Sequence, residues 1–430
     1  MRFIAILAGL TLVVGCSCQR SDLSPDKDAV HYRYGATPRS TSVSSSIADL
    51  EERVRKLPSP IDLTELADLY VQRGQETGDR EAFVKAEALA RQSLEILRSP
   101  NGATLILAKL KNLRHEFAAS IALCNEILAE KPSAAAQKLL VSSYLALGEL
   151  AKAAEIAEAV VATHPDTSAY LTRALVMQAQ GRDNEAAFDF ARAATLEGFG
   201  DQKESARVRA MWARFLMRRG AFDDATQVVN EALHIQPDMA FARALQGELA
   251  LRRGKLEDAR TMFEQAFAGS RQVRYLMDEA RARALSGDAT GAAAVWTQAE
   301  KLVRAELESG IGGHRLDLAE ILIDRGREDE LPEALTLARG EVERRPSADT
   351  RFQLARALAV NGDKAGALVQ MHALLATGMR EAQFYELAAR LERDAGAPTR
   401  ALLYRRLAKQ LDPGGSGWRA LGVQALGFAR

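Results

Sequence analysis

Residues 213–237, ARFLMRRGAFDDATQVVNEALHIQP, contain the pattern that decides the fold. Ala213 is followed seven residues later by Gly220 and five residues after that by Ala225, and the stretch closes with Pro237. The same order of small residue, glycine, small residue and proline recurs about every 33 or 34 residues between residues 60 and 413. A period of this length is typical of stacked helical hairpins, each of which buries its apolar face against its neighbours.

Each position in the pattern has a physical role. A small side chain in each helix lets the two helices of a hairpin approach closely, and a proline cannot continue the second helix. The glycine between them can adopt the left-handed conformation that ends a helix without steric cost. The second repeat departs from the pattern, because His115 stands where the others have glycine. The recurring glycines are Gly74, Gly148, Gly181, Gly220, Gly254, Gly287, Gly326, Gly362 and Gly396.

This pattern resembles the tetratricopeptide repeat (TPR), a helix–turn–helix unit, and the resemblance covers residues 60–413. It implies an all-α fold, a right-handed α-solenoid of about ten such units. One continuous array is the simpler expectation. The alternative is two lobes with a break near residues 200–205, where the spacing is interrupted. We expect residues 414–430 to form a C-terminal cap or tail, since the ends of a solenoid must be shielded.

The first residues are typical of an exported protein. After Met1 and Arg2 comes an uncharged run too short to span a bilayer as a helix but suited to a signal peptide over residues 1–15. Residues 13–16, Val-Val-Gly-Cys, resemble a bacterial lipobox. This resemblance implies cleavage before Cys16, acylation of Cys16, and attachment to a membrane through several acyl chains. Simple secretion and an uncleaved anchor are the alternatives, and in each case the repeats lie outside the cytoplasm.

Residues 16–43 are polar and contain few apolar side chains, so we predict a lipidated flexible linker. In residues 44–59 the spacing of Ile47, Leu50 and Val54 places apolar side chains on one side of a short helix. We expect this helix to cover the exposed face of the first repeat.

Composition and cysteine spacing exclude several classes of function. Lys plus Arg and Asp plus Glu both number 57, so the chain has no overall field that would attract nucleic acid. Cys16, Cys18 and Cys124 form no C-x-x-C pair, and no histidine lies at zinc-ligand spacing from the first two. We therefore predict no metal site, and we interpret Cys124 as a small buried apolar residue.

No catalytic constellation is visible in the repeats. Six histidines are scattered over different units, and residues 310–313 lack the Lys-Ser/Thr of a phosphate-binding loop. The sequence therefore predicts no cofactor and no enzymatic activity. The histidines are His31, His115, His164, His234, His314 and His372.

Arginines mark a candidate ligand-binding groove. In proteins that this chain resembles, the first helices of the units line the concave face and usually meet the ligand. A guanidinium group can hold a carboxylate through two hydrogen bonds, so we expect protein or peptide partners with acidic groups. An anionic polysaccharide would satisfy the same chemistry. The groove candidates are Arg207, Arg214, Arg218, Arg281, Arg356 and Arg390.

The alternative interpretation is that these arginines are ordinary solvated charges paired with Glu248, Asp278 and Glu320. Chaperone-binding relatives use a lysine and asparagine clamp that no unit here contains, which disfavours chaperone tails as ligands.

These observations predict an envelope lipoprotein whose TPR solenoid is a scaffold for protein–protein interaction in assembly or secretion, anchored at the outer membrane and facing the periplasm. One alternative is an adaptor that presents substrates to a periplasmic protease or cell-wall hydrolase. Another is an enzyme hidden in the array.

Overall fold

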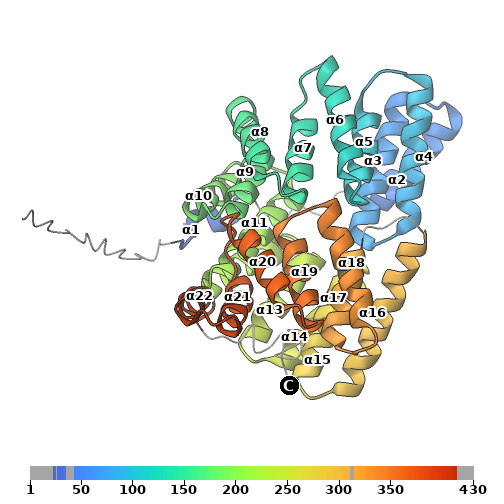
Figure 1. The fold of residues 1–430 in the computed structure, drawn as a ribbon. Helices are drawn as coiled ribbons and strands as arrows, with labels where there is room; N and C mark the ends of the chain where they lie inside the picture. The colour runs from blue at the N-terminus through green and yellow to red at the C-terminus, as the bar shows by residue number, and fades with distance from the viewer. Residues whose placement is uncertain (1–22, 26, 35–42, 310–313, 414–430) are drawn as a thin grey trace, which may run out of the picture.

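The computed structural model describes residues 23–25, 27–34, 43–309 and 314–413. Within these ranges it contains 22 helices and no strand (Figure 1). Two helices, α1 and α2, precede ten antiparallel pairs, and consecutive helices pack against each other along the chain. The predicted all-α solenoid of about ten helix–turn–helix units is therefore confirmed.

The first two helices are α1 (Lys27–Val30) and α2 (Val43–Lys56). Units 1 to 5 are α3 (Pro60–Thr77) with α4 (Arg80–Ile96), α5 (Gly102–Leu113) with α6 (Phe117–Glu130), α7 (Ala134–Ala146) with α8 (Leu150–Thr163), α9 (Thr167–Ala179) with α10 (Asp183–Thr195), and α11 (Gln202–Arg218) with α12 (Phe222–Ile235). Units 6 to 10 are α13 (Ala240–Arg252) with α14 (Leu256–Ser270), α15 (Val273–Leu285) with α16 (Ala289–Ser309), α17 (Arg315–Arg325) with α18 (Leu331–Arg344), α19 (Ala348–Val360) with α20 (Lys364–Leu375), and α21 (Ala382–Asp394) with α22 (Pro398–Leu411).

Local sequence explains where these helices begin and end. Ser59 accepts a hydrogen bond from the Asp62 amide and Pro60 occupies the first position of α3, both typical of a helix N-terminus. Within a pair, the turn glycine adopts a positive φ, as at Gly220 (φ 77°). His115 adopts the same conformation (φ 59°), so the departure in the second repeat changes the residue and not the turn.

The first unit differs from the prediction at its turn. Gly74 lies inside α3, which continues to Thr77, and the left-handed residue is Gly78 (φ 70°). Gly74 has a packing role instead, because a Cβ atom there would lie 2.7 Å from the ring of Phe83. The extra residues after Gly74 therefore lengthen the first helix by about one turn before the chain reverses.

Successive turns of the superhelix touch each other. The hairpin turn of each of the first five units meets the chain that follows the unit five further along. Gly78 lies against Ser270, the ring centroids of His115 and His314 are 6.2 Å apart, and Gly148 lies against Pro346. Gly181 lies against Gly378 in the same way, and Gly220 against Leu411. Figure 1 shows the resulting arrangement, with the early helices stacked beside the late ones.

Carbonyl oxygens of the later units occupy the space that a side chain would need at these glycines. A Cβ atom at Gly181 would lie 2.1 Å from the Gly378 oxygen, and one at Gly220 would lie 2.5 Å from the Leu411 oxygen. Gly254, Gly287 and Gly362 have the same left-handed backbone, but no atom lies within 4 Å of a Cβ atom built there. The difference arises because no further turn of the described array lies above units 6 to 10.

Gly181→Ala should therefore destabilise the protein more than Gly362→Ala. Both substitutions place a Cβ atom on a left-handed residue, which costs about 1–2 kcal/mol. Only the first also pushes two superhelical turns apart, so we expect it to cost at least about 1 kcal/mol more. Urea unfolding of the two variants measures the difference, and equal midpoints would show that the turns do not touch in solution.

A segment before the array packs on its outside. Ala29 and Val30 of α1 are buried in a core cluster formed by α9 to α13, and α1 contacts α10 and α12. The Tyr32 amide donates a hydrogen bond of 2.8 Å to Oε1 of Glu231, and the ring of Tyr34 meets that of Phe199 edge-on at 5.7 Å. We call residues 23–34 the strap.

One fully buried ion pair fastens the strap. The side chains of Arg209 and Glu197 are both 0% exposed, and Nη1 of Arg209 lies 2.7 Å from Oε2 of Glu197. Arg209 also donates through Nε to the carbonyl oxygen of Val30. Its guanidinium carbon lies 5.8 Å from the centroid of the Tyr32 ring.

For residues 23–25 and 27–34 the prediction of a flexible linker is therefore wrong. The segment has few apolar residues, but Ala29 and Val30 fit an existing core and its backbone polar groups find charged partners on α11 and α12. The rest of residues 16–43 lies outside the described residues, as do the predicted signal peptide (residues 1–15) and the predicted tail (residues 414–430). Helix α2 contacts α3, the position expected of a helix that covers the first unit.

Cys124 is a buried core residue, as predicted. Burial raises the pKa of its thiol to about 11, although a hydrogen bond with Ser120 acts in the opposite direction. The thiolate is the reactive form, so at pH 8 the folded protein should react with a disulfide reagent on the order of a hundred times more slowly than the unfolded chain. A variant carrying Cys16→Ser and Cys18→Ser isolates this thiol, and similar rates with and without urea would contradict its burial.

Candidate binding cavity inside the solenoid

The second half of the array encloses a cavity of about 410 Å³. The first helices of units 5 to 9 (α11, α13, α15, α17 and α19) and the start of α21 supply nearly all of its lining. This agrees with the expectation that first helices face the inside of the superhelix.

Arg214 is the least compensated charge in this cavity. Among the described residues it forms no hydrogen bond or ion pair, and its Nε is buried without an acceptor. Its guanidinium carbon lies 5.6 Å from the centroid of the Phe241 ring. Burial and the neighbouring positive charge of Arg218 lower the pKa of Arg214 to about 10, so the group stays charged at neutral pH but is held there at a cost.

Arg218 lies one helical turn beyond Arg214 and has a partner. Its Nη1 is 2.8 Å from Oε1 of Glu381, which precedes α21. Burial lowers the pKa of Arg218, but Glu381, Asp349 and Glu248 outweigh it and raise the pKa overall. Two arginines on one face of α11 therefore differ sharply in how well their charge is balanced.

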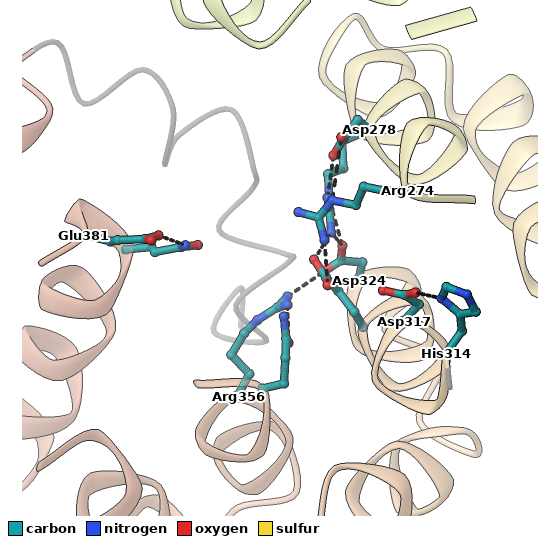
Figure 2. A network of polar contacts seen from close by, with 11 residues as sticks. Arg274, Asp278, His314, Asp317, Asp324, Arg356 and Glu381 are labelled. Carbon is teal, nitrogen blue, oxygen red and sulfur yellow. Dashed lines mark hydrogen bonds and ion pairs between the residues drawn. The ribbon is translucent and has the colours of Figure 1, made fainter. Parts of the chain in front are cut away.

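A buried cluster of charges joins α15, α17 and α19 on the other side of the cavity. Arg281 donates from Nε to Asp324 at 2.9 Å and from Nη1 to Asp278 at 2.8 Å, and Asp324 also accepts a hydrogen bond from Arg356. Arg274 donates to Glu320 at 2.9 Å. Figure 2 shows Arg274, Asp278, Asp324 and Arg356 converging, with Glu381 on the opposite wall.

The cluster favours the ionised form of Glu320. Burial raises the pKa of Glu320, but the arginines 274, 281 and 356 outweigh it and lower the pKa to about 2. A carboxyl group whose pKa is depressed by folding contributes stability above its unfolded value, near 4.5, and loses it as the pH falls toward 2. The ionised form of Glu320 thus stabilises the array at neutral pH, and this contribution is lost in strong acid.

The structure brings together part of the predicted groove. Arg214, Arg218 and Arg281 line the cavity, and Arg356 joins them through Asp324. Arg207 does not line the cavity, because it lies two turns before Arg214 on α11, where it pairs with Glu204 at 2.7 Å. Arg390 lies on α21, pairs with Glu386 at 3.6 Å, and does not line the cavity either.

The alternative interpretation is correct about pairing for most of these arginines, but Arg281 and Arg356 are buried and not solvated. Arg281 pairs with Asp278 and Glu320, as that interpretation expected, and Glu248 pairs with Arg252 instead. Arg214 is the exception.

Sequence reasoning missed the other groups around Arg214. Phe241, Tyr275 and Arg274 line the cavity, and Asp324 holds two of the predicted arginines. Phe241 is the second residue of α13 and Tyr275 is the third residue of α15, so both lie in the first turn of the first helix of their units. An aromatic residue in that turn is the signal that could have found them.

Two other sequence predictions concern residues outside the cavity: the acylation of Cys16 and the absence of a metal site. Cys16 lies outside the described residues. His115 and His314 come together, and His314 also lies 2.7 Å from Asp317 (Figure 2), but no group of three metal-ligating side chains occurs within the described ranges. The pKa of His314 is raised, since Asp317 and Glu306 outweigh the effect of its burial.

Comparisons with known proteins identify no family. No protein-family model matches the sequence, and no curated protein matches it. The solved structures with a similar arrangement of helices include two of human IFIT1. The human IFIT1 dimer with PPP-AAAA has a TM-score of 0.49 and 16% identity, over 86% of each chain. The human IFIT1 dimer with m7Gppp-AAAA has a TM-score of 0.47 and 14% identity, over 90% of this chain and 99% of that chain.

Fold and cavity together define a TPR-like helical repeat protein with an internal cavity. The ligands named with the two solved structures belong to those proteins. Our expectation that this chain does not bind nucleic acid stays a prediction.

Proposed function

We propose that this protein is a scaffold that binds segments of partner proteins inside its solenoid and has no catalytic role. One observation carries the proposal: Arg214 holds a charged guanidinium group, with a buried Nε that has no acceptor, inside a cavity that apolar side chains also line. Leaving a buried charge unpaired is costly, and a bound anionic group would remove that cost. A solenoid lined by its first helices offers an extended surface for such segments.

We further propose that acylation at Cys16 anchors the scaffold in a bacterial envelope, at the outer membrane and facing the periplasm. The support is the lipobox-like Val-Val-Gly-Cys over residues 13–16. No helix within the described residues is long and apolar enough to cross a membrane.

Because the strap packs on the array, an anchor at Cys16 would limit the distance between the array and the membrane. Six residues separate Cys16 from Leu23, and each extends the chain by at most about 3.6 Å. An anchor at Cys16 would then hold units 4 and 5 within about 25 Å of the lipid surface. The 27-residue flexible linker expected from the sequence would have allowed far more freedom.

Site-specific photo-cross-linking in the native host tests the binding role. Phe241 in the cavity and Phe188, which is 64% exposed on α10, are each replaced by benzoylphenylalanine, a change that keeps the aromatic ring. We expect discrete protein adducts from position 241 and none of the same size from position 188. Identical adduct patterns, or none from position 241 under ultraviolet light, would reject binding in the cavity.

Labelling with a radioactive fatty acid tests the anchor. The wild-type protein should incorporate label and sediment with outer membranes, and Cys16→Ser should do neither. Cys18→Ser is the matched control, since the same residue type lies two positions away. Labelling that survives Cys16→Ser would refute this assignment.

The adaptor hypothesis predicts a different set of adducts. If the cavity presents substrates to a hydrolase, the proteins cross-linked at position 241 should be substrates that accumulate when a periplasmic protease or cell-wall hydrolase is deleted. A stable set of assembly or secretion components favours the scaffold.

A further inference from the structure

Three polar groups in the cavity lack partners within the described residues: the guanidinium of Arg214, the hydroxyl of Tyr275 and the carboxylate of Asp349. Tyr275 is only 5% exposed, and burial raises the pKa of its hydroxyl, so it stays protonated and able to donate. Arg214 lies close enough to Tyr275 to act on its titration. Two donors without acceptors therefore lie near each other on α11 and α15.

We propose that Arg214 and Tyr275 form a binding site for a single carboxylate group of a peptide, whose adjoining apolar side chain packs against Phe241. The proposal rests on the proposed function of the cavity and names the chemistry of its ligand. A carboxylate accepts hydrogen bonds from a guanidinium and a phenol at once, and it supplies the acceptor that Arg214 Nε lacks.

The charges around the site favour a peptide over a polyanion. The cavity is lined by five arginines and six acidic residues, so its net charge does not attract a chain of negative groups. Asp349 and Glu381, which partly offset the charge of Arg214, would repel further anionic groups once one carboxylate is bound. The free carboxylate of Asp349 would instead accept hydrogen bonds from the backbone amides of a peptide, which a polysaccharide lacks.

The apolar wall supports the same choice. Phe241, Leu245, Met217 and Phe352 line the cavity, and the Phe241 ring lies against the Arg214 guanidinium. An apolar or aromatic side chain next to the carboxylate would pack against this wall, and burial of its apolar surface would stabilise the complex. An anionic polysaccharide offers no comparable group.

The test uses N-acetyl-L-phenylalanine, which carries one carboxylate and one aromatic ring, and N-acetyl-L-phenylalaninamide, which lacks the charge. Both are titrated onto the full chain and followed by ligand-observed NMR. We expect saturable binding of the acid and at least tenfold weaker binding of the amide, the usual effect of losing a hydrogen bond to a charged group.

Variants assign the binding to the site. Arg214→Gln should weaken acid binding about tenfold or more, Arg214→Lys by less, and Tyr275→Phe by several-fold. Arg207→Gln is the matched control, because it removes an arginine of the same helix that is paired with Glu204 outside the cavity. Circular dichroism checks that each variant keeps its helical content.

Three results would overturn the proposal: no saturable binding of the acid, equal binding of acid and amide, or equal losses in Arg214→Gln and Arg207→Gln. Displacement of the acid by alginate would reassign the site to polyanions. None of these results depends on the cross-linking at position 241, so the carboxylate site can fail while the scaffold role stands. Absence of adducts at 241 with intact acid binding would reject the scaffold role alone.

Discussion

Replacing Arg209 with methionine is expected to lower the free energy of unfolding by about 3–5 kcal/mol. The substitution leaves the carboxylate of Glu197, which is 0% exposed, without its countercharge. It also removes the donor that holds the Val30 carbonyl, so the strap loses its central contact. Urea unfolding followed by circular dichroism measures the loss, and tryptic cleavage after Lys27 and Arg33 should become faster in the folded protein.

The double variant Arg209→Met with Glu197→Gln separates the charge from the packing. It removes the buried anion as well, so it should be more stable than the single variant although it also lacks the ion pair. If both variants lose the same stability, Glu197 is not buried as an anion in solution. If cleavage of the strap does not change, Arg209 does not hold it.

Asp324→Asn should have an effect of similar size, about 3–5 kcal/mol. The side chain of Asp324 is 2% exposed and accepts hydrogen bonds from Arg281 and Arg356, so it neutralises guanidinium groups from two different helices. Asparagine keeps the shape but removes the charge, which leaves a net positive cluster between α15, α17 and α19. The urea midpoint of the variant measures the loss.

Asp349→Asn is the control for this result. Asp349 is exposed in the same cavity and pairs with no described residue, so its substitution should change the free energy of unfolding by no more than about 0.5 kcal/mol. If both substitutions lower the free energy of unfolding equally, the cluster stabilises the protein through long-range electrostatics and not through its hydrogen bonds.

Local features of the fold were accessible from the sequence. The turn glycines and the prolines act on their own neighbours, so their period alone predicted helix pairs that the structure contains, for example around Gly220 and Gly254. The first unit shows the limit of this reasoning. A glycine in the expected phase, Gly74, serves helix packing, and the turn uses Gly78.

Contacts between distant units were not accessible in this way. The period states that units repeat but not how far each rotates relative to the last, and that rotation decides which loop meets Gly181 or Gly220. The charge pairs depend on the same rotation. Arg207, Arg214 and Arg218 share one helix and a similar sequence context, yet one pairs outside the cavity, one has no partner among the described residues, and one pairs with Glu381.

The strap was missed for a related reason. It buries two apolar residues of α1, too few to mark a folded segment, and its affinity for the array comes from Arg209, Glu197 and Glu231, which lie far away in the sequence. A prediction from composition considers only the polar segment itself and not the distant residues that bind it.

The hairpin turns of units 1 to 5 each contact the loop that follows the unit five further along. These contacts restrict how the number of repeats can change. In an open stack, a whole module can be duplicated or lost with only local effects. Here, loss of a unit between units 4 and 9 would put the hairpin of unit 4 opposite a different loop, so that Gly181 would no longer face Gly378. The ten units therefore depend on one another for these contacts. We expect deletion of a single unit to lower the free energy of unfolding by far more than the contribution of that unit alone.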